Sequence, residues 1–373
     1  MAQRRSLSVD LESTRYYHCI TRCVRRAYLC GEDAVTGKSF EHRREWIEKR
    51  IVRLSGIFAV DVYAYAVMSN HLHVVVRVDE ERAAGWDDDE VVRRFGGLFR
   101  LAKKELDAMA PAAKKARIAE WRERLGSLSW MMRALNEWIA RKANKEDGCK
   151  GRFWEGRFTS QPLLDEQALV TCMAYVDLNP VRAGMTKTLE GSAHTSIRAR
   201  LEEAASFLDV HADDDDARAR RATPRAAREA FEEARTRRTK AQLVPEGLAP
   251  FADQVPKYEA EVVLGHISDV ASDERDPGRP LAAPMNFIDY LELVEWAGRC
   301  VREKGGVTQG QLSHTPVLLT RLQMDPRGWL RAMTRHGLSH VGVLGSIEHV
   351  QAHAERQGKA WVRGVGHARR VAA

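Results

Sequence analysis

The sequence lacks several features that would assign a protein to a class at once. It has no apolar run of the roughly 18 residues that a membrane-spanning helix requires, no secretory signal and no internal repeat, and its C-terminal half carries no cofactor signature. Its six cysteines include no second close pair to match Cys19 and Cys23, so a zinc site is not expected. These absences predict a cytoplasmic protein with reduced thiols and no membrane partner.

Charge is unevenly distributed along the 373 residues. Lys and Arg number 59 against 52 Asp and Glu, a net charge of +7. Residues 91–157 alone hold 17 basic and 8 acidic side chains. A positive block of this kind favours a polyanionic partner such as nucleic acid.

The most informative stretch is residues 67–78, VMSNHLHVVVRV, which alternates with the period of a β-strand. One face would carry Leu72, Val74, Val76 and Val78, and the other His71, His73, Val75 and Arg77. Two neighbouring imidazoles on one face can hold a metal ion. The alternative is a strand that ends with two solvent-facing histidines.

Around this strand, the pattern predicts a strand at 16–22, a helix at 39–55 and a strand at 57–66. The order is β-α-β-β, half of a split β-α-β unit of ferredoxin type. An acidic loop is expected at 79–89, then helices at 91–106 and 130–143. Residues 104–129 between them are predicted to be an inserted, solvated helical excursion.

Glycine, arginine and aromatic residues interleave in the segment 148–158, GCKGRFWEGRF. Glycine allows close backbone approach, guanidinium groups bind phosphates, and aromatic rings stack on unpaired bases. The alternative is a β-turn whose aromatic side chains pack in the core, and the two roles are compatible.

Asp165 is placed to cap a helix that runs to about Leu178 and ends before Asn179-Pro180. Tyr175 and Asn179 are four residues apart and therefore share a helix face. A lone helical tyrosine is more often a core residue than a nucleophile. Beyond this helix we expect a charged linker region at 199–284 and a mainly helical region of unknown role at 285–373.

Together these residues suggest phosphodiester chemistry. Two imidazoles leave most of the coordination sphere of a divalent ion open to oxygen ligands, and a tyrosine hydroxyl can act as a covalent nucleophile. The segment 70–73, NHLH, resembles the HUH motif of single-tyrosine transposases. Residues 175–184, YVDLNPVRAG, resemble their nucleophile helix, and 151–158, GRFWEGRF, the segment that precedes it. Within that insertion-sequence 200-like family the chain is most similar to the REP-associated tyrosine transposases, over about residues 11–198.

The resemblance implies an α+β fold in which residues 1–198 form a ferredoxin-like β-α-β-β-α-β palm with an antiparallel sheet. It implies that Tyr175 attacks single-stranded DNA at a hairpin to leave a 5′-phosphotyrosine. It also implies that His71, His73 and Asn179 bind Mg²⁺ or Mn²⁺, the imidazoles favouring manganese. The expected DNA-binding residues are Arg22, Arg25, Arg26, Lys150, Arg152, Trp154, Arg157 and Arg182.

Two departures from the family pattern stand out: the interval from His73 to Tyr175 is longer than in compact members, and the C-terminal half has no counterpart in the shared motifs. A competing hypothesis is a non-catalytic, domesticated binder of palindromic DNA, which would need neither metal nor Tyr175. A hydrolase of small phosphates would use the histidines but not the basic block. Whether the protein is a monomer or a homodimer is left open.

Overall fold

The computed structural model describes residues 9–24, 29–33, 37–99, 102–208, 222–237, 239–255, 280–301, 314–334, 338 and 341–372. Within them, four strands form one antiparallel sheet in the order β2-β3-β1-β4. The strands are β1 (Tyr16–Arg22), β2 (Val60–Val67), β3 (His71–Val78) and β4 (Thr159–Leu163). The predicted α+β class with an antiparallel sheet is confirmed.

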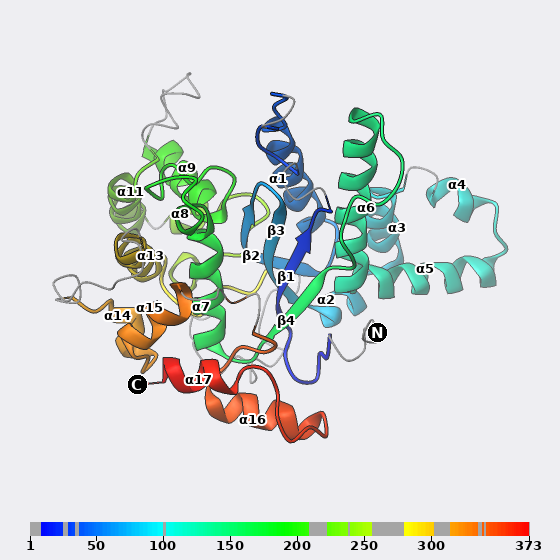
Figure 1. Ribbon diagram of the computed structural model, residues 1–373. Helices are drawn as coiled ribbons and strands as arrows, with labels where there is room; N and C mark the ends of the chain where they lie inside the picture. The colour runs from blue at the N-terminus through cyan, green and yellow to red at the C-terminus, as the bar shows by residue number, and fades with distance from the viewer. Residues whose placement is uncertain are drawn as a thin grey trace.

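Helices cover both faces of this sheet (Figure 1). The elements from β1 to β4 are α1 (His42–Ser55), α2 (Glu80–Ala84), α3 (Asp88–Gly96), α4 (Ala102–Asp107), α5 (Pro111–Leu125) and α6 (Leu128–Glu146). After β4 come α7 (Glu166–Asp177), α8 (Asn179–Arg182), α9 (Ser196–Leu208), α11 (Pro224–Arg237), η2 (Lys240–Leu243) and η3 (Ala252–Gln254). The last are α13 (Phe287–Val301), α14 (Val317–Arg321), α15 (Pro326–Thr334), α16 (Ile347–Arg356) and α17 (Val365–Val371).

The alternation predicted for β3 is confirmed by the two cores that it separates. Leu72, Val74 and Val76 pack with α1 and α6 on one face of the sheet. Val75 belongs to the other core, which contains α7, α9 and α13. Because consecutive strand residues point to opposite faces, the histidines at 71 and 73 are directed to the α7 side with Val75.

Several predicted boundaries differ from the structure for local reasons. The expected acidic loop at 79–89 contains α2 and the start of α3, because Asp79 and Asp87 each cap a helix by accepting a backbone N–H. The single helix expected at 91–106 is two helices, since α3 ends at Gly96. The first helix begins at His42 rather than residue 39, and its N-cap, Glu41, makes no side-chain capping bond.

The predicted excursion is helical, but it is not wholly solvated. Ile118, Trp121 and Leu125 of α5 are buried in the core beneath α1 and α6, and Trp121 stacks on Phe95 with 4.4 Å between ring centroids. The insertion therefore lies on the opposite side of the sheet from α7 (Figure 1).

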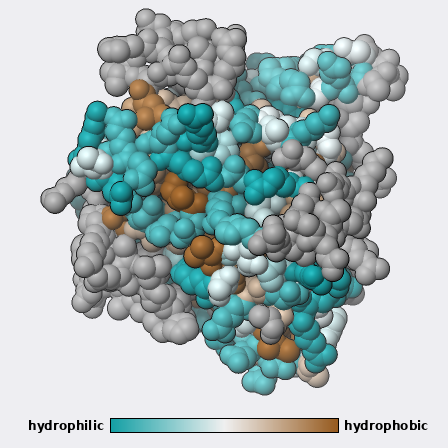
Figure 2. All heavy atoms as spheres, turned by 90° about the vertical axis from the view of Figure 1, so that its left-hand side faces the viewer, coloured by the Kyte–Doolittle hydropathy of each residue, from teal (hydrophilic) through white to brown (hydrophobic). Residues whose placement is uncertain are grey.

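The segment predicted as a linker also contributes to a core. Ala227, Ala230 and Phe231 of α11 are buried in the same cluster as α7 and α13. The side of the molecule that carries α9, α11 and α13 has a mostly hydrophilic surface with small, separated apolar patches (Figure 2). Among the described helices, none has both the length and the apolar character needed to cross a bilayer.

Candidate functional site

The two motif histidines lie where β3 begins. His71 is paired with Arg22, the last residue of β1, and His73 lies opposite Ile20. Both imidazoles are on the sheet face that α7 covers. The rings of His71 and His73 are 4.7 Å apart between centroids and nearly perpendicular.

Tyr175 of α7 lies beside this pair of rings. Its ring centroid is 5.9 Å from that of His73, and the side chain is only 5 % exposed. The Arg182 guanidinium lies over the Tyr175 ring, 4.2 Å from its centroid, a distance typical of a cation–π contact. The longer interval between His73 and Tyr175 thus does not keep the two apart.

The histidines are held in their neutral form by their surroundings. Burial lowers the pKa of His71 to about 4, and the Arg22 guanidinium and the neighbouring His18 imidazole act in the same direction. Burial also lowers the pKa of His73, with further contributions from His18 and His71. A neutral imidazole keeps the lone pair that metal coordination requires.

The hydrogen bonds of these imidazoles leave one nitrogen of each ring available. His71 Nδ1 is 2.6 Å from Asn70 Oδ1, and His73 Nδ1 is 2.8 Å from His18 Nε2. His73 Nε2 is buried and has no hydrogen-bond partner among the described residues. A buried imidazole nitrogen without a partner is the observation that best fits a metal ligand here.

Asn179 begins the short helix α8 immediately after α7. Leu178 between them keeps helical dihedral angles, and Pro180 occupies the first turn of α8, where a missing N–H costs nothing. Asn179 is 7 % exposed, and its Nδ2 is another buried atom without a partner in the described chain. The predicted end of the helix before Asn179-Pro180 is confirmed, since α7 ends at Asp177, and a separate short helix, α8, begins at Asn179.

In the described part of the chain, no group of three or more His, Cys, Asp or Glu side chains is arranged to hold a metal ion. A cation at His71 and His73 would depend for its remaining ligands on an amide, water and substrate oxygen. That donor set suits Mn²⁺ or Mg²⁺ better than a structural zinc ion.

Several predicted DNA-binding residues gather at the same end of the sheet. Arg22 is exposed beside His71, and its carbonyl accepts a hydrogen bond from the backbone N–H of Glu155. Lys150, Arg152 and Arg157 are exposed on the segment that follows α6. Arg25 and Arg26 lie outside the described residues.

Trp154 differs from these residues in being buried. Its side chain is 9 % exposed, its N–H donates to the Asn136 carbonyl at 2.8 Å, and its ring meets Phe153 edge-on at 4.8 Å. The backbone at Trp154 forms a β-bridge to Cys23. Of the two alternatives for this aromatic segment, the arrangement of Trp154 corresponds to core packing.

The helix that carries Tyr175 is bound along its length by the C-terminal third of the chain. At its start Asp165 accepts a hydrogen bond from Ala168 N and another from Ser346 N. In the middle Trp329 Nε1 donates to Thr171 Oγ1 at 3.0 Å. At its end Tyr290 donates to Asp177 at 2.5 Å.

Two residues of this site were not predicted from the sequence. His18 of β1 contacts both His73 and Tyr175, with its ring 5.0 Å from the first and 6.2 Å from the second. Gln161 of β4 lies 3.0 Å from His18 Nδ1. His18 could have been noticed as a polar residue among the strand formers of β1, YYHCITR, whereas β4, TSQPL, has no pattern that singles out Gln161.

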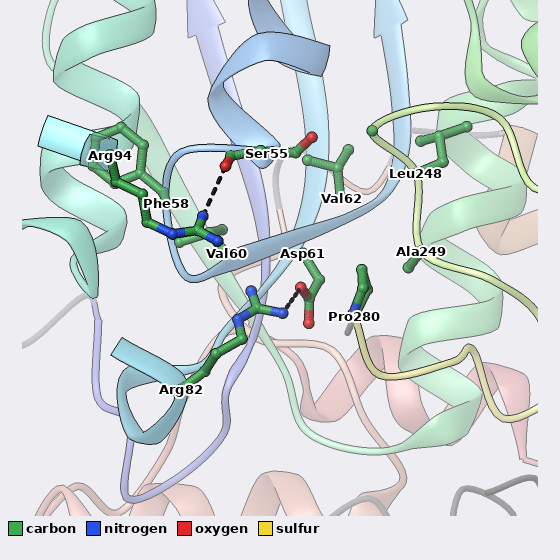
Figure 3. Close-up of a pocket in the computed structure, with 12 residues that line it drawn as sticks. Ser55, Phe58, Val60, Asp61, Val62, Arg82, Arg94, Leu248, Ala249 and Pro280 are labelled. Carbon is green, nitrogen blue, oxygen red and sulfur yellow. Dashed lines mark hydrogen bonds and ion pairs between the residues drawn. The ribbon is translucent and has the colours of Figure 1, made fainter. Parts of the chain in front are cut away.

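A cavity of about 200 Å³ lies at the opposite end of β2, beside Asp61 and Arg82 (Figure 3). Its arginines are occupied by protein partners. Arg82 Nη1 is 2.6 Å from Asp61 Oδ1, and Arg94 Nη1 donates to the Gly56 carbonyl at 2.7 Å. Because its cations are already neutralised or bonded, this cavity is a weaker candidate than the histidine cluster.

No family model matches the sequence, and no curated protein matches it. A solved structure of a REP-associated tyrosine transposase bound to a REP hairpin is similar over 57 % of this chain and 93 % of that one, with 13 % identity and a TM-score of 0.31.

Proposed function

We propose that this protein is a metal-dependent tyrosine transposase that nicks and rejoins single-stranded DNA at hairpin-bearing, REP-like palindromic sequences. The observation that carries the proposal is the position of Tyr175, with its ring 5.9 Å from His73 and with His71 beside it. A nucleophile, two imidazoles with available nitrogens and exposed arginines meet at one end of the sheet.

In the proposed reaction the Tyr175 oxygen attacks a DNA phosphorus atom. The Tyr175 hydroxyl gives up its proton, a bond from its oxygen to phosphorus forms, and the bond from phosphorus to the 3′ oxygen breaks. The leaving 3′ oxygen takes up a proton and becomes a hydroxyl, so that no net proton is gained or lost. The 5′-phosphotyrosine conserves the energy of the phosphodiester bond, so a second 3′-hydroxyl can reverse the step and rejoin the strand.

The remaining residues have supporting roles. His71 and His73, with the amide of Asn179, would hold Mg²⁺ or Mn²⁺, which when bound draws charge from the phosphate oxygens. Arg182, over the Tyr175 ring, would favour the negative charge of the attacking phenolate and of the phosphate. Arg22, Lys150, Arg152 and Arg157 would bind the DNA backbone.

We further infer that the sheet and its nearest helices form the ferredoxin-like palm of this transposase type. The strand order β2-β3-β1-β4 with every neighbour antiparallel supports this inference, as does the position of α7 over the histidine-bearing face.

The test is formation of a covalent adduct. The protein is incubated with an end-labelled pool of single-stranded stem-loops with randomised flanks, with and without Mn²⁺, and run on a denaturing gel. We expect a metal-dependent, denaturation-resistant band that disappears in Tyr175→Phe while hairpin binding persists. Tyr16→Phe is the matched control, since Tyr16 lies at the other end of β1, opposite Arg77, and should retain the adduct.

Other outcomes identify the competing functions. An undiminished adduct in Tyr175→Phe would remove Tyr175 as the nucleophile, and metal-dependent cleavage unchanged in both His71→Ala and His73→Ala would rule out the metal site. A mobility shift without any adduct would favour a non-catalytic binder of palindromic DNA. Absence of both would favour a hydrolase of small phosphates.

A further inference from the structure

A line of buried polar side chains crosses three strands and ends at His73. Gln161 of β4 lies directly opposite His18 of β1, and His18 is diagonal to His73 of β3. Gln161 Oε1 is 3.0 Å from His18 Nδ1, and His18 Nε2 is 2.8 Å from His73 Nδ1. All three side chains are at most 3 % exposed, so water does not compete for these bonds.

The direction of these hydrogen bonds is fixed at the Gln161 end. Gln161 Nε2 faces two backbone carbonyl oxygens, that of Leu338 at 3.0 Å and that of Val341. Carbonyl oxygens only accept, so the amide NH₂ uses its two hydrogens on them. Turning the amide over would place its oxygen against two other oxygens. Gln161 Oε1 must therefore accept a hydrogen from His18.

The remaining assignments follow one by one. His18 carries its hydrogen on Nδ1, and a neutral imidazole has only one N–H, so His18 Nε2 is an acceptor. His73 Nδ1 must then donate to it. The lone pair of neutral His73 is left on Nε2, the buried nitrogen that has no partner among the described residues.

We propose that Gln161 and His18 are positioning residues that hold His73 as its Nδ1–H tautomer and so present the Nε2 lone pair to a divalent cation. The proposal rests on the proposed function for the identity of that cation. It also gives the C-terminal region a role at the site, because the carbonyls of Leu338 and Val341 set the direction of the whole line.

His71 does not depend on this line. Its Nδ1 faces the Asn70 side-chain oxygen at 2.6 Å, an acceptor supplied by the preceding residue. With the Asn70 amide in this orientation, His71 is also the Nδ1–H tautomer, held by a local partner, whereas His73 is held through the sheet. Loss of the line should alter His73 and leave His71 unchanged.

The first test uses metal-free wild-type protein labelled with ¹⁵N-histidine. We expect the nitrogen spectrum at neutral pH to show His73 protonated on Nδ1, with its signals assigned by their loss in His73→Ala. Protonation of His73 on Nε2 would overturn the proposal, and this measurement requires no variant of His18 or Gln161 to fold.

The second test measures Mn²⁺ affinity without DNA, from the loss of the free-ion electron paramagnetic resonance signal. His18→Leu and Gln161→Leu should each weaken Mn²⁺ binding by roughly 10- to 100-fold, the usual effect of removing the partner of a metal-ligating histidine. Tyr17→Phe is the control. Tyr17 precedes His18 in β1 and points to the opposite face of the sheet, where its hydroxyl bonds to the Asp10 and Thr14 carbonyls. The Mn²⁺ affinity of this variant should match that of the wild type.

The outcomes separate the two proposals. Wild-type affinity in both His18→Leu and Gln161→Leu would overturn the positioning role. Complete absence of Mn²⁺ binding by the wild type would overturn the proposed function and the metal-presenting role, while the nitrogen spectrum would still decide the hydrogen-bond direction.

Discussion

The hydroxyl of Tyr290 provides a quantitative test of how α13 is joined to the end of α7. It donates to Asp177 Oδ2 at 2.5 Å, while Asp177 Oδ1 accepts from Ser196 Oγ at 2.5 Å and from Ile197 N at 2.9 Å. The pKa of Asp177 is raised, chiefly by burial, although these three donors and nearby Arg200 act in the opposite direction. Two hydroxyls and a backbone N–H are directed at its two oxygens, an arrangement that suits a carboxylate acceptor, and the test below takes that as its premise.

Tyr290→Phe removes one of these donors without changing the ring that packs in the core. A hydrogen bond to a charged group contributes about 1.5–3 kcal/mol, compared with about 0.5–1.5 kcal/mol between neutral groups. The matched control is Tyr63→Phe. Tyr63 is also fully buried, and its hydroxyl donates to a neutral acceptor, the Leu281 carbonyl, at 2.7 Å.

The measurement is the free energy of unfolding from urea denaturation at neutral pH. We expect Tyr290→Phe to lower it by about 2 kcal/mol and Tyr63→Phe by about 1 kcal/mol. Equal losses in the two variants would refute the reasoning, because they would indicate that Asp177 carries its own proton and that Tyr290 contacts a neutral group.

Two further predictions concern the start of α7 and the basic segment. The hydrogen bond to Asp165 raises the pKa of His349 above 6.5. Burial alone would raise the pKa of Asp165, but His349 and Ser346 N lower it below 3.8. The stability from Asp165 is lost as pH falls through its lowered pKa, and that from His349 as pH rises through its raised one. The loss of thermal stability in His349→Ala should therefore be greatest at pH values between the lowered pKa of Asp165 and the raised pKa of His349. A loss of stability that grew at alkaline pH would contradict this prediction. Arg152→Ala should reduce the slope of log affinity for single-stranded DNA against log salt by about 0.7, as removal of one phosphate contact does; an unchanged slope would exclude Arg152 from the DNA contacts.

The parts of the site that could be predicted from the sequence are those fixed by local geometry. The pleat of a strand places His71 and His73 on one face whatever the strand pairs with. Asp165 caps α7 by accepting a hydrogen bond from Ala168 N, only three residues further along the chain. Tyr175 and Asn179 are four residues apart, so one helical turn is enough to place them on the same side, and this too is a local effect.

The parts that could not be predicted depend on strand pairing. His18 meets His73 across 55 residues, and Gln161 meets His18 across 143. Only the register of β1 with β3 and β4 makes them neighbours, and register is set by the whole core and the turns rather than by any single segment. Burial of Trp154 was likewise undetermined, since an aromatic residue beside arginine is equally suited to packing and to stacking.

The two cores of the sheet have a consequence for synthesis of the chain. The core beneath α1 and α6 is built almost entirely from residues between Tyr17 and Phe158, so most of it is available early during translation. The core that supports α7 includes residues from Tyr16 to Val371, and contacts this distant in sequence form late. If the proposed function holds, a ribosome-bound chain carries a largely assembled binding platform but an incomplete nicking centre. The cell would then be exposed to the cutting activity only after α17 has been made.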